Sequence, residues 1–188
     1  MDPFTHTQEI EVCGRRLRFR PVRPGDEEAL LAFIRERLSR RSQYLFRPHN
    51  PDDPEGCRRE FAGRIARHGE RHDLTLVVEQ DGAVVGYCFL WGLDQGREGI
   101  PTLGIGLADA LHGLGVGGAM MDDLIARARA LGLRAIELTH ESTNHRAARL
   151  YRSRGFVYTG EERPCGPDSA RVERVMRLDL TAGQRTSR

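Results

Sequence analysis

The chain has 188 residues, of which 30% are charged and 39% hydrophobic, and its formal net charge is +2. This length suits one domain with its own core, and the composition excludes a disordered chain and gives no sign of a dedicated nucleic-acid partner. All 29 basic residues are arginine, which excludes the P-loop and Schiff-base or pyridoxal chemistry, because both need a lysine amine.

The cysteines and the N-terminus bear on the cellular compartment. Cys13, Cys57, Cys88 and Cys165 include no C-x-x-C pair, so we expect neither a metal site nor a disulfide framework. The N-terminus lacks an apolar signal region, and no run approaches the ~18 apolar residues of a membrane helix. The sequence therefore predicts a cytoplasmic protein with reduced thiols and no membrane partner.

The first half of the chain predicts two hairpins and two helices. Pro24-Gly25-Asp26 signals a helix start, and Asp81-Gly82 suits a tight hairpin turn. The predicted elements are strands 9–12 and 16–22, a helix over about 26–38, a helix over 55–68, and strands 74–79 and 83–91. Residues 39–54 are rich in arginine and end in prolines, so their apolar side chains either line a substrate cleft or pack as a connector.

The second half is organised around a strand, a glycine-rich connector and a helix. Strand 102–108 contains Gly104 and Gly106, and strand glycines mark a bulge or a close approach by a backbone or ligand. Gly132 suits the residue after the helix. The remaining predictions are strand 135–139, a helix after Ser142-Thr143-Asn144, and strands 156–159 and 172–180, the last at the sheet edge.

The connector, His112-Gly113-Leu114-Gly115-Val116-Gly117-Gly118, indicates an anion site. A glycine loop at a helix start presents unpaired backbone N–H groups at the positive end of the helix dipole. Because glycine has no Cβ, a phosphate can approach these amides closely. The alternative is a flexible turn without a ligand.

The sequence of this loop fits the motifs of two protein families. Gly113-x-Gly115-x-x-Gly118 matches the dinucleotide-binding fingerprint, and Glu137 lies about twenty residues later, where that motif places a ribose-binding acid. However, about four residues separate the strand from the first glycine, and too little chain follows for a second mononucleotide half. An NAD-binding domain is therefore the minor alternative.

The other pattern has two parts: His112-x-x-Gly115-x-Gly117, and Asn144-x-x-Ala147-x-x-Leu150-Tyr151-x-x-x-Gly155-Phe156. In this order the motifs resemble the GNAT superfamily of acetyltransferases, over about residues 9–180. The family usually has Arg or Gln where His112 stands. The resemblance implies an α/β (α+β) fold: a mixed, strongly twisted sheet of about seven strands flanked by helices, with two parallel strands splayed apart. It also implies a short extension over 1–8, one N-acetyltransferase domain over 9–180 and a polar tail over 181–188.

The resemblance implies acetyl-coenzyme A as acyl donor, with its pantetheine arm between strands 102–108 and 135–139. An N–H near Leu107 would bind the thioester oxygen as negative charge develops, a role that free amides in a strand gap can fill. The expected coenzyme-binding residues are Leu107, Ala108, His112, Gly113, Leu114, Gly115, Val116, Gly117, Gly118, Asn144 and Tyr151.

The resemblance also places Tyr151 beside the coenzyme sulfur, where its hydroxyl would protonate the departing thiolate. The attacking amine must be neutral, and a free alkylamine has a pKa of ~10.4, so a general base or a water chain is required. Glu98 is the first choice, and the alternatives are Asp94, Glu137 and His140.

The acceptor stays open between a small amine and a protein or peptide lysine, and a homodimer is a further open point. Residues 38–45 resemble a segment of the subgroup that modifies protein lysines. A sensor that binds coenzyme A without turnover is the non-enzyme alternative, because His112 replaces the usual residue and strand 102–108 carries no carboxylate.

Overall fold

The computed structural model describes residues 1–94, 99–164 and 172–181. Its eight described strands form one sheet in the order β1-β2-β3-β4-β5-β6-β8-β7. The strands are β1 Gln8–Val12, β2 Arg15–Pro21, β3 Asp73–Gln80, β4 Ala83–Trp91, β5 Thr102–Leu107, β6 Ala135–Glu141, β7 Val157–Pro164 and β8 Val172–Asp179. The helices are α1 Glu27–Ala32, α2 Arg40–Leu45, α3 Pro54–Gly69, α4 Val116–Ala130 and α5 His145–Ser153. The predicted mixed sheet is confirmed, with eight strands in place of about seven.

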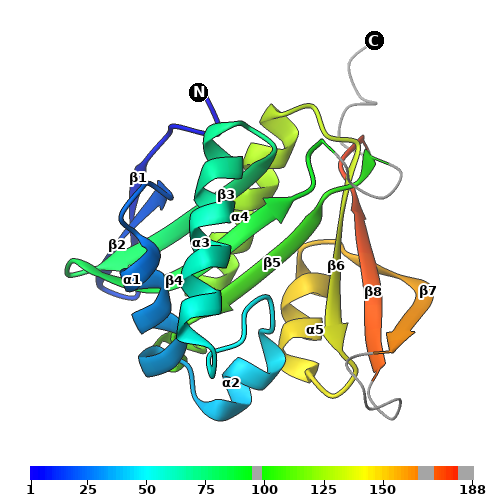
Figure 1. The fold of residues 1–188 in the computed structure, drawn as a ribbon. Helices are drawn as coiled ribbons and strands as arrows, with labels where there is room; N and C mark the ends of the chain where they lie inside the picture. Colours follow the sequence, from blue (N-terminus) through cyan, green and yellow to red (C-terminus); the bar gives the residue numbers. More distant parts are fainter. Residues whose placement is uncertain (95–98, 165–171, 182–188) are drawn as a thin grey trace.

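Helices cover both faces of the sheet, with α3 across the front in Figure 1 and α4 behind it. Both faces of strand β4 carry core residues, because successive side chains of a strand point to opposite faces of the sheet. The Tyr87 ring contacts Phe61 of α3, with ring centroids 6.0 Å apart. The neighbouring Gly86 instead faces α4, where a Cβ would lie 2.9 Å from the Met120 methyl group. The core therefore has two layers, and β4 contributes to both.

Both predicted hairpins are confirmed, and their turns share one geometry. Cys13 and Gly14 between β1 and β2 have φ angles of 49° and 71°. Asp81 and Gly82 between β3 and β4 have φ angles of 51° and 78°. Two consecutive positive φ angles are typical of the type I′ turn, whose twist matches that of the flanking strands.

Two predicted elements differ from the structure. The helix expected over 26–38 is α1 followed by a π-helical segment, Phe33–Arg37, which keeps Phe33 and Ile34 buried. Strand β8 was expected at the sheet edge, but it lies between β6 and β7. Its arginines pair with carboxylates of the neighbouring strands while they stay partly exposed, as Arg177 does with Glu137 at 3.0 Å. Alternation of apolar and polar residues shows that one face of a strand is buried. Inner and edge strands both have such a face, so the pattern could not place β8 in the sheet.

The topology excludes the dinucleotide-binding alternative. That fold needs a doubly wound, mostly parallel sheet. Among the described strands, β5 and β6 form the single parallel pair and the other neighbours are antiparallel. The NAD-binding prediction is therefore wrong. No helix within the described ranges is long and apolar enough to span a bilayer.

The first residues of the chain pack against the domain. Phe4 is only 6% exposed. The guanidinium of Arg127 on α4 donates to the carbonyl oxygens of Pro3 and His6. His68 accepts from the backbone N–H of Thr75 through Nδ1, at 3.1 Å. Its Nε2–H therefore donates to the Phe4 carbonyl, also at 3.1 Å. The buried imidazole is thus held neutral, with both nitrogens in use.

We expect His68 to make the protein less stable in mild acid. Burial, assisted by the charge of Arg127, lowers its pKa below the ordinary value of 6.5. The unfolded chain therefore binds the proton more readily than the folded protein. The contribution of neutral His68 to the free energy of unfolding is complete above about pH 6.5 and is lost as the pH falls toward the folded pKa. Urea unfolding at pH 7.5 and 5.5 should show a smaller drop in unfolding free energy for His68→Gln than for the wild type. His145→Gln, at an exposed position, is the control and should behave like the wild type. Equal drops in His68→Gln and the wild type would contradict this assignment.

Candidate active site

The site begins where β5 and β6 separate. Their described residues pair at one position, Thr102 with Glu137, and the Glu137 N–H donates to the Pro101 carbonyl at 3.1 Å. Beyond this point the two strands diverge (Figure 1). On the far side of β5, Ala108 N–H donates to Val85 O at 2.8 Å. Because alternate amides of an antiparallel strand point to opposite sides, the Leu107 amide is directed toward the gap.

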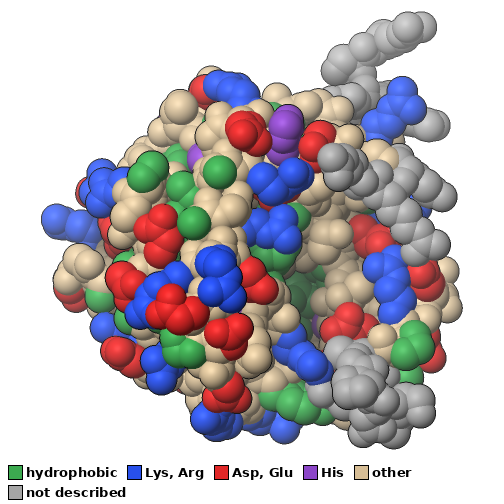
Figure 2. Space-filling model, viewed as in Figure 1, with side chains coloured by type: hydrophobic (Ala, Val, Ile, Leu, Met, Phe, Trp, Pro, Cys, Tyr) green, Lys and Arg blue, Asp and Glu red, His purple; other side chains and the backbone are tan. Residues whose placement is uncertain are grey.

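A cavity of about 570 Å³ lies along this gap, between α2, β5, the glycine loop and the start of α5. Figure 2 shows a hollow on this face with hydrophobic side chains at its floor and arginines near its rim. The cavity brings together eight of the predicted coenzyme-binding residues, Leu107, His112, Gly113, Gly115, Gly117, Gly118, Asn144 and Tyr151. Ala108, Leu114 and Val116 are not among the residues that line it.

The glycine loop presents backbone amides to the cavity. Gly113 and Gly115 have φ angles of 79° and 83°, values that glycine adopts without strain. The first intrahelical bond of α4 runs from Ala119 N–H to Gly115 O, at 3.1 Å. The amides of the three residues before Ala119 therefore point out of the helix end, where the dipole favours an anion.

Two neighbours fix the position of this loop. The Cys13 thiol in the first hairpin turn donates to the Leu114 carbonyl, with Sγ 3.3 Å from the oxygen. His112 donates its Nε2–H to the Leu107 carbonyl at 3.0 Å. Burial and the charge of Arg146 lower the pKa of His112. A neutral His112 thus ties the loop to the end of β5.

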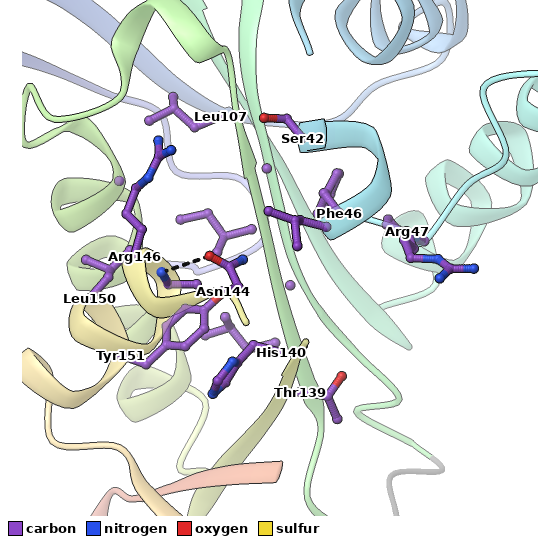
Figure 3. A pocket seen from close by; sticks show the side chains of 18 of the residues that line it. Ser42, Phe46, Arg47, Leu107, Thr139, His140, Asn144, Arg146, Leu150 and Tyr151 are labelled. Carbon is purple, nitrogen blue, oxygen red and sulfur yellow. Dashed lines mark hydrogen bonds between the residues drawn. The ribbon is translucent and has the colours of Figure 1, made fainter. Parts of the chain in front are cut away.

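Arg146 was not singled out from the sequence, yet it lines the cavity. Figure 3 shows its side chain pointing toward the Leu107 end. It lies in the first turn of α5, where the helix dipole disfavours a positive charge. Its place two residues after Asn144, in the first turn of the predicted helix, is the feature by which it could have been found in the sequence.

Asn144 and Tyr151 belong to α5 and reach the same cavity. Asn144 caps the helix, because its Oδ1 accepts from the Ala147 N–H at 3.2 Å (Figure 3). Its Nδ2 group is left to donate to a ligand. Tyr151 is 7% exposed, and burial raises the pKa of its hydroxyl to about 12. The hydroxyl stays protonated throughout the neutral range and can donate a hydrogen bond into the cavity.

His140 at the end of β6 is held in one tautomer. Its Nδ1–H donates to the Glu141 carbonyl at 2.9 Å, because a carbonyl oxygen can only accept. Its Nε2 therefore carries the lone pair and accepts from the Tyr158 hydroxyl at 3.2 Å. Burial, with the charge of Arg174, lowers the pKa of His140. Since His140 also lines the cavity, the cavity wall includes a neutral imidazole whose basic nitrogen is bonded to Tyr158.

Glu137 and Asp94, two of the other predicted bases, do not line the cavity. Glu137 accepts from Arg163 at 2.8 Å and from Arg177 at 3.0 Å, so both of its oxygens are engaged. Asp94 pairs with Arg67 at 2.9 Å. Glu98 lies outside the described residues. No group of three His, Cys, Asp or Glu residues in the described ranges could hold a metal ion.

Aromatic and aliphatic side chains from residues 38–48 and from β4 line the cavity beside β5. Leu45 and Phe46 of the segment 39–54 contribute, as the cleft interpretation expects, whereas Tyr44 is exposed and does not line it. Phe89 and Trp91 of β4 were not singled out from the sequence. Their period-2 pattern identified a strand but not which residues border the cavity.

A family model described as the acetyltransferase (GNAT) domain matches residues 16–157. The mycothiol acetyltransferase of Sanguibacter keddieii is 28% identical over 142 residues, which are 73% of this chain and 42% of that protein. The L-methionine sulfoximine/L-methionine sulfone acetyltransferase of Pseudomonas paraeruginosa is 30% identical over 118 residues, 62% of this chain and 66% of that protein. The chain thus spans less than two thirds of either relative.

The fold has a close match among solved structures. The yncA structure from Salmonella typhimurium, which holds its cofactor acetyl-CoA, has a TM-score of 0.68 and 22% identity. The match covers 87% of this chain and 94% of that one. Because the family model spans most of the chain and the sheet has the same architecture, the chain belongs to the GNAT acetyltransferase family.

Proposed function

We propose that this chain transfers the acetyl group of acetyl-CoA to a primary amine by direct attack in a ternary complex. The observation that carries the proposal is one cavity that joins an amide-lined glycine loop to Tyr151 and His140. The names of both curated relatives, each an acetyltransferase, support the reaction class. The yncA structure supports the choice of acyl donor.

In this proposal the glycine loop holds the coenzyme pyrophosphate. The amides of Gly115 through Gly118 would donate to its oxygens, and Arg146 would add a charge-assisted bond. The Leu114 amide instead donates to the Leu111 carbonyl at 3.4 Å, and the Ala108 amide to Val85 on the far side of β5. Leu107 would border the pantetheine arm in the strand gap, where Asn144 would donate its Nδ2–H. His112 would act by holding the loop against β5, because its Nε2–H is already donated to Leu107.

The reaction forms a carbon–nitrogen bond and breaks the carbon–sulfur bond. The Leu107 amide would stabilise the negative oxygen that develops on the thioester carbon. Tyr151 would give its proton to the departing thiolate. Burial raises the pKa of this hydroxyl to about 12, so the proposed role depends on its position in the cavity and on a thiolate basic enough to take the proton.

His140 is the base that we propose, in place of the first expectation, Glu98. Its Nε2 is unprotonated at neutral pH and accepts from the Tyr158 hydroxyl, and the Glu141 carbonyl fixes its tautomer. The proton lost by the attacking amine would pass to the Tyr158 oxygen as the Tyr158 hydroxyl gives its own proton to Nε2. Glu98 stays a prediction, as do Asp94 and Glu137, although the ion pairs of the latter two make them weaker candidates.

A coenzyme A sensor without turnover remains the second candidate. It is favoured by one observation: all six residues of β5 line the cavity, and none of them carries a carboxylate. Only a rate measurement separates a sensor from an enzyme.

Coenzyme binding is tested by calorimetric titration with acetyl-CoA, coenzyme A and NAD. We expect micromolar binding of the coenzyme A pair and none of NAD. Gly117→Ala should weaken binding about tenfold, or about 1.4 kcal/mol, because its methyl group enters the cradle. The new Cβ would lie 3.5 Å from Leu150, an ordinary contact, so the variant should fold. Gly63→Ala in α3, where a Cβ meets open space, is the matched control and should keep full affinity. NAD binding alone would overturn the proposal.

Arg146→Ala belongs to the same titration, and it too should weaken binding about tenfold through loss of a charge-assisted bond. Arg149→Ala on the same helix is exposed and outside the cavity, so it should bind like the wild type.

Tyr151→Phe tests the acid. We expect kcat to fall roughly 10²- to 10³-fold, within the range for lost proton transfer, with an unchanged Kd for acetyl-CoA. Tyr44→Phe, at an exposed position outside the cavity, is the control. A wild-type protein that binds acetyl-CoA but transfers no acetyl group to any amine would favour the sensor.

His140→Gln tests the base through the pH profile of kcat at saturating acceptor. The neutral imidazole is the active form, so wild-type kcat should fall as the pH drops through the lowered pKa of His140, below the ordinary 6.5. The variant should lose at least about 10²-fold in rate and should lack this acid limb. His145→Gln, exposed at the start of α5, should keep it. An unchanged acid limb in His140→Gln would assign the base elsewhere.

A further inference from the structure

The acceptor end of the cavity is formed by aromatic side chains lying over glycines. Across the antiparallel ladder of β4 and β5, Phe89 is opposite Gly104. A Cβ at Gly104 would lie 2.0 Å from Phe89 Cζ. A Cβ at Gly106 would lie 2.6 Å from Phe46 Cε1. Two rings therefore occupy the space in which β5 would otherwise present side chains.

These rings form a fixed surface, the aromatic wall, made of Phe46, Phe89 and Trp91. Phe89 and Trp91 stack with centroids 3.5 Å apart and an interplanar angle of 9°. The indole Nε1–H donates to Thr75 Oγ1 at 3.3 Å. Phe46 packs edge-on against the buried Tyr87 ring, with centroids 6.0 Å apart. Contacts inside the protein thus hold the wall in place without a ligand.

The wall is poorly suited to a second positive charge. The Arg64 guanidinium lies 3.6 Å from the Trp91 ring centroid and is itself held by Asp73 at 2.8 Å. A cation therefore already covers one face of the indole, and Phe89 stacks against the ring system. Among the described residues that line the cavity, Glu173 is the single carboxylate. It belongs to β8, where it is paired with Glu141 of β6. The following residue of β8, Arg174, is paired with His140.

The two sides of the acceptor end thus differ in chemistry. His140 and Glu173 on β6 and β8 suit the amine, whereas the aromatic wall on α2 and β4 suits an uncharged apolar group. Figure 3 shows Phe46 approaching from α2 and His140 from the side of β6. We propose that the acceptor is a small primary monoamine with an aromatic or similarly bulky apolar group near its nitrogen, in preference to a polyamine or a protein lysine. This inference rests on the proposed acetyl transfer and specifies its substrate class.

The test measures thiol release from acetyl-CoA by the wild type with four acceptors: phenethylamine, ethylamine, spermidine and a lysine-containing peptide. We expect kcat/KM for phenethylamine to exceed each of the others by about 10- to 100-fold, the range that burial of one phenyl group supports. Phe46→Ala should reduce the phenethylamine-to-ethylamine ratio at least about fivefold. The more conservative Phe46→Leu should reduce it less, which keeps the test valid if the alanine variant is unstable.

Tyr44→Ala is the matched control, because Tyr44 lies on the same helix but is exposed and outside the cavity. It should keep the wild-type ratio. Equal rates with phenethylamine and ethylamine, a preference for spermidine or the peptide, or no transfer to any of the four amines would overturn the inference. Calorimetry with acetyl-CoA keeps the two proposals apart: loss of coenzyme binding contradicts the proposed function, whereas binding with another acceptor preference contradicts only the substrate class.

Discussion

The parting of β5 and β6 is the constraint on which the rest of the site depends. The strands are joined at Thr102 and Glu137 and separate beyond this pair. Glu137 in turn is held by Arg163 and Arg177 from β7 and β8. A fixed junction at one end and free backbone at the other leave a wedge-shaped gap lined by amides. An opening of this kind would be costly in a continuous sheet, because its polar groups would have no partners. A ligand that offers acceptors along its length satisfies them.

The glycine loop, the two hairpins and the order of helices and strands could be predicted, because each depends on local signals. The spacing of Gly113, Gly115 and Gly117 places amides at a helix start, and the Cys13-Gly14 and Asp81-Gly82 turns require positive φ angles. The inner position of β8 could not be predicted, because pairing between distant strands leaves no local mark. The aromatic wall was missed for a similar reason. Gly104 and Gly106 indicate that something comes close, but not that Phe89 and Phe46 do so.

Because Gly104 and Gly106 have no side chains, other elements supply the side chains of the site at these positions. If β5 carried a carboxylate, that strand could supply the base. Here β5 supplies backbone groups, and the proposed base comes from β6. The Glu141 carbonyl accepts from one imidazole nitrogen of His140, and the other nitrogen accepts from the Tyr158 hydroxyl. Burial lowers the pKa of His140 and favours its neutral form. The proposed base and the apolar surface thus belong to separate elements, so that a change in one need not alter the other.

The hydrogen bond of Cys13 couples the first hairpin to the glycine loop. The turn of the first hairpin reaches across to the glycine loop, and the thiol of Cys13 is bonded to the carbonyl of Leu114. A shift of this loop on ligand binding would therefore be transmitted to β1 and β2, at one end of the sheet order. Cys13 is exposed, whereas Cys57 and Cys88 are buried. A fluorophore attached through its sulfur would sit against the loop and report its occupancy from outside the cavity.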